Sequence, residues 1–179
     1  MGETKPPVPV KLITGILSSV IELFPEAEKV LQNKFGPIDQ KTNLIPFAFT
    51  TYYNESMGTP IKRQFLSFQK LINPASIARI KIWTNQMEKR FAKKVGQSNI
   101  ARPINFDPGY LNAAKLILAS TKDYSHRIYL DGGIYAEVTL YYQNGTYRTS
   151  PWTYPDYQTK EYLDFFQSVR QTYLKQIKS

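Results

Sequence analysis

Residues 102–157 read RPINFDPGYLNAAKLILASTKDYSHRIYLDGGIYAEVTLYYQNGTYRTSPWTYPDY and contain the strongest structural signals in the chain. From Arg127 to Glu137, apolar and polar residues alternate on both sides of Asp131-Gly132-Gly133, which is typical of a β-hairpin. Asn144-Gly145 marks a second hairpin shortly afterwards. The sequence therefore predicts an antiparallel meander in this part of the chain.

The length of the first hairpin loop determines which side chains share a face of the meander. A two-residue loop at Gly132-Gly133 would place Ile128 opposite Glu137 and would mix apolar with charged side chains. A three-residue loop with a left-handed Gly133 separates the two kinds, so we predict this register. It pairs Leu130 with Ile134 and Ile128 with Ala136 on an apolar face closed by His126 and Val138, and Tyr129 with Tyr135 and Arg127 with Glu137 on the opposite face.

The second hairpin, with a type I′ turn at Asn144-Gly145, extends the polar face of the meander. Its register places Tyr142 opposite Tyr147 and Leu140 opposite Thr149 toward the core, with Tyr141 opposite Arg148 and Thr139 opposite Ser150 on the other side. One interpretation is a ligand site, in which Arg127 and Arg148 hold an anion and Tyr129, Tyr135 and Tyr141 stack on it or donate to it. The alternative is an ordinary half-exposed sheet with a common Arg127–Glu137 cross-strand pair.

The composition favours one compact domain. The chain has 179 residues, of which 42% are hydrophobic, so we predict a single domain over residues 1–179. It has no cysteine, which excludes disulfides, thiolate metal sites and cysteine nucleophiles. No apolar run reaches the length of a membrane span. We therefore expect a cytoplasmic protein without a membrane partner.

The net charge of +9 is concentrated in the middle of the chain. Residues 60–102 contain ten Lys and Arg residues against Glu88 alone, while charges elsewhere cancel. On a helix in this segment, basic side chains would share a face near Trp83, and such a surface could follow a nucleic-acid backbone. The alternative is a solvated face whose lysines interact favourably with the helix dipole. The basic residues of this face are Arg79, Lys89, Arg90, Lys93 and Lys94.

The order of the remaining elements indicates an α+β fold. Patterns predict strands at residues 8–17, 44–53, 62–72 and 102–106, with helices at 25–35 and 74–95. This β-α-β-β-α-β order is that of ferredoxin-like folds, in which two helices cover one face of an antiparallel sheet. We predict a ferredoxin-like core over residues 8–107, a meander extension over 108–157 and a C-terminal helix within 158–179. Asp107-Pro108-Gly109-Tyr110 favours a turn or short helix, and residues 116–120 fit either a strand or the end of a helix.

Motifs with an established chemical mechanism are absent: G-x-x-x-x-G-K-[ST], G-x-G-x-x-G and G-x-S-x-G do not occur. The catalytic candidates are Glu137, Asp107 and His126, although the predicted register points His126 into the apolar layer. In an enzyme hypothesis Glu137 is the base, and Arg127, Tyr129 and Asp107 position the substrate. Acidic residues that could join His126 around a metal have no diagnostic spacing, so no metal site is predicted and no cofactor is identified.

Five motifs carry a resemblance to a known family. They are TTYYNESMG at residues 50–58, DPGYL at 107–111, SHRIYL at 125–130, EVTL at 137–140 and WTYPDY at 152–157. With them the chain resembles, over nearly its whole length, a prokaryotic family known only as a domain of unknown function. The resemblance implies no established activity. It suggests that the Thr51 loop, the Asp107 turn and the His126 strand assemble together.

The leading functional hypothesis is binding of an anionic partner. This partner is either nucleic acid along the basic helix or a phosphorylated small molecule over the face of Arg127 and Arg148. The alternatives are the enzyme described above and a protein–protein interaction module.

Overall fold

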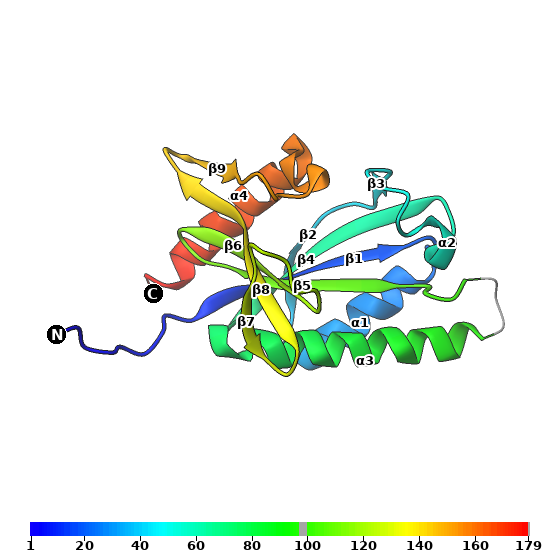
Figure 1. Cartoon of the computed structure of the whole chain (residues 1–179), viewed down its shortest axis with the longest axis horizontal. Helices are drawn as coiled ribbons and strands as arrows, with labels where there is room; N and C mark the ends of the chain where they lie inside the picture. The colour runs from blue at the N-terminus through cyan, green and yellow to red at the C-terminus, as the bar shows by residue number, and fades with distance from the viewer. Residues whose placement is uncertain (97–99, 179) are drawn as a thin grey trace.

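The computed structural model describes residues 1–96 and 100–178. Within these residues, one antiparallel sheet of nine strands has the order β2-β4-β1-β5-β6-β8-β7, while β3 pairs with β4 and β9 with β8 (Figure 1). The strands are β1 Val10–Ser18, β2 Ile38–Lys41, β3 Ile45–Phe47, β4 Ile61–Ile72, β5 Asn105–Leu111, β6 Lys115–Ser120, β7 Ile128–Asp131, β8 Ile134–Gln143 and β9 Thr146–Thr149. The helices are α1 Leu23–Phe35, α2 Asn54–Met57, α3 Ile77–Val95 and α4 Lys160–Gln176, with 3₁₀ turns η1 Pro74–Ser76 and η2 Pro155–Gln158.

Strand β1 divides the hydrophobic core into two layers. Because side chains alternate along a strand, Leu12 and Ile16 are buried in the cluster shared with α1 and α3, whereas Ile13 is buried in the cluster shared with α4. Figure 1 shows α1 and α3 along one side of the strands and α4 along the other. The chain is therefore an α+β protein with helices on both faces of its sheet.

Two short strands in the N-terminal half, β2 and β3, differ from the sequence prediction. The strand predicted at residues 44–53 covers only Ile45–Phe47, and α2 begins at Asn54. Strand β2 was not predicted, because its sequence IDQK has no apolar alternation. Tertiary contacts hold it instead: Asp39 pairs with buried Lys11 and accepts a hydrogen bond of 2.6 Å from Ser67 Oγ.

The prediction of a turn or short helix at Asp107-Pro108-Gly109-Tyr110 is wrong, since these residues lie inside β5. A proline is tolerated in a strand where its missing N–H faces no partner. Pairing of β5 with β6 begins only at Gly109, so Pro108 meets this condition. A Cβ on Gly109 would lie 2.2 Å from the carbonyl oxygen of Ile117, so glycine is what allows β6 to approach. Residues 116–120, left open by the sequence, belong to strand β6.

The first hairpin has the predicted register, but its loop is one residue shorter than predicted. The pairs Ile128–Ala136 and Tyr129–Tyr135 are confirmed, but Asp131, and not Leu130, pairs with Ile134. The loop therefore contains two residues, Gly132 and Gly133, both with positive φ. A bulge at Leu130 supplies the extra residue that the predicted three-residue loop would have supplied.

The second hairpin forms as predicted. Leu140 pairs with Thr149, Tyr141 with Arg148 and Tyr142 with Tyr147. The two turn residues, Asn144 and Gly145, both have positive φ, as a type I′ turn requires.

Burial in the first hairpin differs from the prediction at two positions. Ile128, assigned to the apolar face, lies on a strand at the edge of the sheet and is 73% exposed, whereas Glu137, on the predicted polar face, is 3% exposed. His126 does not point into the apolar layer, since its Nε2 lies 3.1 Å from Glu137 Oε2. The part of the polar face around Glu137 and Thr139 is covered by residues 150–158, which follow β9.

Candidate functional site

A cavity of about 400 Å³ opens where β5 and β6 separate. Residues 105–108 of β5 lie beyond the part of β5 that pairs with β6, which begins at Gly109. Each of the five motifs of the sequence contributes a residue to the wall of this cavity. One lining residue from each motif, in chain order, is Tyr53, Asp107, Arg127, Glu137 and Asp156. The structure thus brings together the Thr51 loop, the Asp107 segment and the strand that follows His126.

Where β5 does not pair with β6, side chains of helix α3 make hydrogen bonds to the backbone of β5. Lys81 Nζ donates to the carbonyl oxygen of Phe106 at 2.7 Å, and the Phe106 N–H donates to Glu88 Oε1 at 2.8 Å. Glu88 Oε2 also accepts a hydrogen bond from Arg102 at 3.0 Å. Buried backbone groups need such partners, so α3 stabilises the opening and places the ammonium of buried Lys81 in the cavity wall.

The floor of the cavity is built on Arg63, whose side chain is 4% exposed. Its Nη1 donates to Asp107 Oδ2 at 3.0 Å, and its Nη2 donates to Asp156 Oδ2 at 3.1 Å. A Cβ on Gly15 of β1 would lie 2.7 Å from Nη1, so the glycine provides room for the guanidinium. The guanidinium also lies 5.2 to 5.7 Å from the rings of Phe47, Phe65 and Tyr157.

The pKa values of the two carboxyl groups that pair with Arg63 are shifted in opposite directions. Burial alone would raise the pKa of Asp107, but Arg63 and Lys81 outweigh it and hold this pKa below its ordinary value. Burial raises the pKa of Asp156, and Arg63 offsets this only in part because Asp107 acts in the same direction as burial. Asp156 therefore keeps its proton to a higher pH than Asp107 does.

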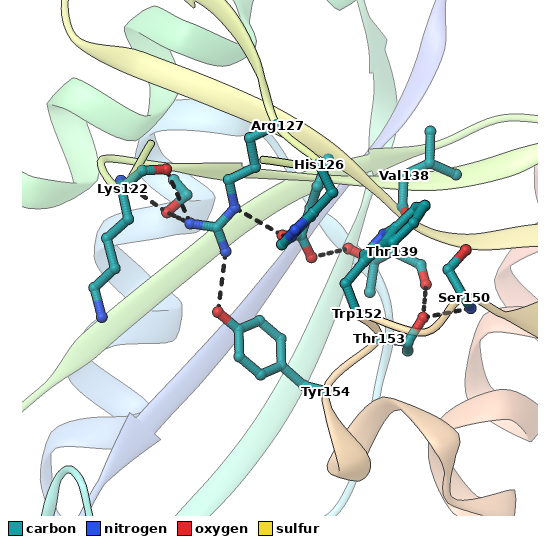
Figure 2. Close-up of polar contacts among 11 residues, drawn as sticks. Lys122, His126, Arg127, Val138, Thr139, Ser150, Trp152, Thr153 and Tyr154 are labelled. Atoms are coloured by element: carbon teal, nitrogen blue, oxygen red, sulfur yellow. Dashed lines mark hydrogen bonds and ion pairs between the residues drawn. The ribbon is translucent and has the colours of Figure 1, made fainter. Parts of the chain in front are cut away.

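A second charged cluster, shown in Figure 2, lies around Arg127. Arg127 Nε donates to Glu137 Oε2 at 2.8 Å, and Nη2 donates to Tyr154 Oη at 3.0 Å. Nη1 donates to Ser120 Oγ at 2.8 Å and to the Lys122 carbonyl at 3.0 Å. These contacts use most of the guanidinium's donors, so Arg127 acts chiefly as a support of the wall.

Glu137 is saturated in the same cluster. Its Oε2 contacts Arg127 and His126, and its Oε1 accepts a hydrogen bond of 3.0 Å from Thr139 Oγ1. A carboxylate with all these partners is held in place, which favours an orienting role. His126 stacks on Trp152, with ring centroids 5.2 Å apart and an interplanar angle of 12°.

The segment after β9 is fastened to β8 by side chains drawn in Figure 2. Trp152 Nε1 donates to the Val138 carbonyl at 3.1 Å, and Thr153 Oγ1 donates to the Thr139 carbonyl at 2.7 Å. The Ser150 N–H donates to Thr153 Oγ1 at 2.8 Å. This attachment brings WTYPDY over the polar face of the meander and delivers the carboxylate of Asp156 to Arg63.

The mouth of the cavity is aromatic. Four lining rings are largely solvent-exposed, and among them Tyr52 reaches 63%. Lys122 Nζ lies 4.4 Å from the centroid of the Tyr52 ring and donates to its hydroxyl at 3.3 Å. The exposed rings are those of Phe49, Tyr52, Tyr124 and Tyr154.

The structure separates the residues that the sequence grouped on one face. Arg127, Glu137 and Asp107 line the cavity, and His126 lies behind Glu137. The other four predicted ligand-binding residues are not among the lining residues: Tyr129, Tyr135, Tyr141 and Arg148. Tyr129 and Tyr135 contact each other across β7 and β8, and Tyr141 pairs with exposed Arg148 across β8 and β9.

The basic residues of α3 form a separate surface. Arg79, Lys89, Arg90, Lys93 and Lys94 are all exposed. Trp83 instead packs against the core, with its ring centroid 5.2 Å from that of Phe35. Within residues 1–96 and 100–178, no group of three or more His, Asp and Glu side chains could hold a metal ion.

Sequence reasoning missed the floor of the cavity. Arg63 lies between Ile61 and Phe65 on one side of β4, and a charged residue between two buried apolar ones was the available signal. Lys81 was a comparable signal on α3, since it falls outside the exposed basic face. No local signal marked Asp156, because its partner, Arg63, lies 93 residues away in the sequence.

In the described part of the chain, no helix is long and apolar enough to cross a membrane.

Comparisons with known proteins place the chain in a family. No curated protein and no solved structure matches the sequence. A family model does match, over residues 8–173, and these residues contain the entire cavity. Since the match covers most of the chain, the protein belongs to the family described as Domain of unknown function (DUF4416).

Proposed function

We propose that the cavity binds a small organic anion that carries a planar ring. The observation that carries this proposal is the concentration of exposed aromatic rings at the mouth of a cavity of about 400 Å³. Exposed aromatic side chains gathered at one hollow typically mark a binding site, and ligand cavities commonly have about this volume.

The charge of the lining supports an anionic ligand. Five basic side chains line the cavity against three acidic ones, Asp107, Glu137 and Asp156. Arg63 and Arg127 are engaged by carboxylates, but an ammonium has three N–H groups. Lys81 and Lys122 each donate one side-chain hydrogen bond within the described residues, which leaves donors for a carboxylate or phosphate. The anion site predicted around Arg127 and Arg148 is therefore proposed at the two lysines.

We propose that the site belongs to a single domain, residues 1–179, whose core is ferredoxin-like. The consecutive antiparallel strands β2-β4-β1-β5, with α1 and α3 packed on one face, support that arrangement. The absence of cysteine agrees with the proposed cytoplasmic location.

Replacement of Lys122 tests the anion site. We expect Lys122→Ala to weaken binding of a ring-bearing anion about three- to tenfold, because an exposed cation contributes about 1 kcal/mol. Isothermal titration with inorganic phosphate, benzoate, indole-3-acetate and adenosine monophosphate measures the effect, and we expect ring-bearing anions to bind more tightly than phosphate.

Lys89→Ala is the matched control, since Lys89 is an exposed lysine on α3 outside the cavity. It removes the same charge and should leave the affinity unchanged. The proposal is wrong if none of the four anions binds, or if both variants weaken binding equally.

The exposed basic face of α3 favours nucleic acid as a second candidate. Replacing Lys89, Arg90, Lys93 and Lys94 by Ala should flatten the dependence of binding on salt by about one unit of slope per lost phosphate contact. Fluorescence anisotropy with labelled single-stranded and double-stranded RNA and DNA at several salt concentrations measures this slope. An unchanged slope would dispose of this candidate.

A further inference from the structure

Two carboxyl groups share one buried cation at the floor of the cavity. The Oδ2 atoms of Asp107 and Asp156 accept from different nitrogens of Arg63, at 3.0 and 3.1 Å. Both residues also line the cavity, so the same three groups that form the ion pairs face the space available to a ligand. Asp107 has two further cations nearby, Lys81 and Arg102, whereas Asp156 pairs with Arg63, so the burial of Asp156 is compensated less completely.

The surroundings favour a proton on Asp156 over a proton on Asp107. Asp107, on β5, faces Arg63 from β4, Lys81 from α3 and Arg102, all cationic. Asp156, on η2, faces Arg63, the carboxylate of Asp107 and its own neighbour Tyr157. The pKa of Asp107 is accordingly lowered and that of Asp156 raised. Two carboxyl groups whose environments push their pKa values apart are the usual arrangement of a base and an acid in one site.

A third group offers a hydrogen bond at the same place. The hydroxyl of Tyr157 is buried, lines the cavity and has no hydrogen-bond partner among the described residues. Burial raises the pKa of this hydroxyl well above its ordinary value, so it remains a donor. An unpaired buried donor is costly, and an oxygen of a bound molecule would satisfy it.

We propose that the cavity is a proton-transfer site, in which Asp107 accepts a proton from the substrate and Asp156 donates one to it. The inference rests on the proposed function in one respect, namely that a ring-bearing molecule enters this cavity. The substrate class that follows is a molecule with an acidic C–H bond next to a carbonyl or imine, which isomerises by moving a proton.

The step balances without a metal or a second reactant. Asp107 takes the proton from carbon, the C–H electron pair forms a C=C bond, and the carbonyl π pair moves to oxygen. That oxygen takes the proton of Asp156, while the Tyr157 O–H donates a hydrogen bond to it. In a substrate with a C=C bond at the β,γ positions, Asp107 then gives its proton to the γ carbon and the remaining double bond shifts to the α,β position. The O–H electron pair restores the carbonyl as Asp156 takes back the proton from oxygen, so both carboxyl groups end as they began.

The Kemp elimination of 5-nitrobenzisoxazole tests this directly, because a carboxylate base drives it and an acid beside the leaving oxygen accelerates it. The base removes the C–H proton, the C≡N bond forms as the N–O bond breaks, and the oxygen, stabilised by a hydrogen bond from the acid, is released as a coloured phenolate. We expect the protein to accelerate this reaction about 10²-fold over acetate at equal concentration and pH, the lower end of general base catalysis. The rate should fall below the pKa of Asp107 and above that of Asp156.

The variants Asp107→Asn and Asp156→Asn keep the shape of each side chain. Asp107→Asn should reduce the rate to that of buffer without protein, and Asp156→Asn should lower the maximal rate and remove the fall at high pH. Asp39→Asn is the matched control, because Asp39 also pairs with a buried cation, Lys11, but lies outside the cavity. Circular dichroism establishes that each variant is folded before its rate is compared.

The outcomes separate this inference from the proposed function. Wild-type protein that reacts no faster than acetate, or Asp107→Asn that retains the rate, overturns the proton-transfer site. The probe is uncharged, so this result does not depend on whether any anion of the binding panel is bound. Binding of the anions without acceleration of the probe would leave the proposed function standing and remove the inference.

Discussion

Replacing Arg63 by Met is expected to destabilise the protein by about 3–5 kcal/mol at neutral pH, the usual cost of removing one partner from a buried ion pair. Met fills a similar volume but leaves Asp107 and Asp156 together without their cation. Arg63 is 4% exposed and lies against three aromatic rings, so these apolar neighbours offer no hydrogen bonds in place of those from the guanidinium. Urea unfolding, followed by circular dichroism, measures the change.

The destabilisation caused by Arg63→Met should decrease as the pH falls. Asp107 has a lowered pKa in the folded state, so its contribution to stability is present above the unfolded pKa and is lost as the pH falls through the folded pKa. The difference between wild type and Arg63→Met should therefore shrink in acid. A cost below about 1 kcal/mol at neutral pH, or one independent of pH, would contradict the buried cluster.

Replacing Gly109 by Ala should destabilise the protein by about 3 kcal/mol, at the upper end of the cost of overpacking. The added Cβ would lie 2.2 Å from the carbonyl oxygen of Ile117 and 2.8 Å from Leu118 Cδ2. The first of these atoms belongs to the backbone and cannot rotate away, so β5 and β6 must separate. Chemical unfolding measures the loss, and increased hydrogen exchange at residues 116–118 locates it.

Gly2→Ala provides the control for this substitution. No atom lies within 4 Å of a Cβ placed on Gly2, so the stability should remain within about 0.5 kcal/mol of wild type. If Gly109→Ala proves equally neutral, the close approach of β5 to β6 is wrong, and with it the position at which the cavity opens.

Much of the local structure could be predicted because its signals are local. Asn144-Gly145 specifies a type I′ turn by itself, and the pairs Leu140–Thr149 and Tyr142–Tyr147 follow by counting. The first hairpin shows the limit of such counting. Its register at Ile128–Ala136 is as predicted, although the loop is shorter and Leu130 forms a bulge, because the burial of Ile134 outweighs ideal loop geometry.

The candidate site could be predicted only in fragments. Asp107, Arg127 and Glu137 were identified, but the sequence placed Arg127 and Glu137 on a solvated sheet face with Tyr129 and Arg148. The structure covers the part of that face around Glu137 with residues 150–158, through hydrogen bonds from Trp152 and Thr153 to β8, and leaves Tyr129 and Arg148 exposed. A covering segment cannot be inferred from strand alternation, which distinguishes two faces but not which of them is buried.

The sequence by itself determined the α+β class, the two hairpins, the C-terminal helix and the excess of positive charge, since each depends on neighbours along the chain. Only the tertiary structure decided where the cavity lies and which charges face it. Arg63, Asp107 and Asp156 come from β4, β5 and η2, and their hydrogen bonds span 44 and 93 residues of sequence. Such contacts form because burying a guanidinium requires carboxylates, whatever their distance along the chain, and packing selects which ones can reach it.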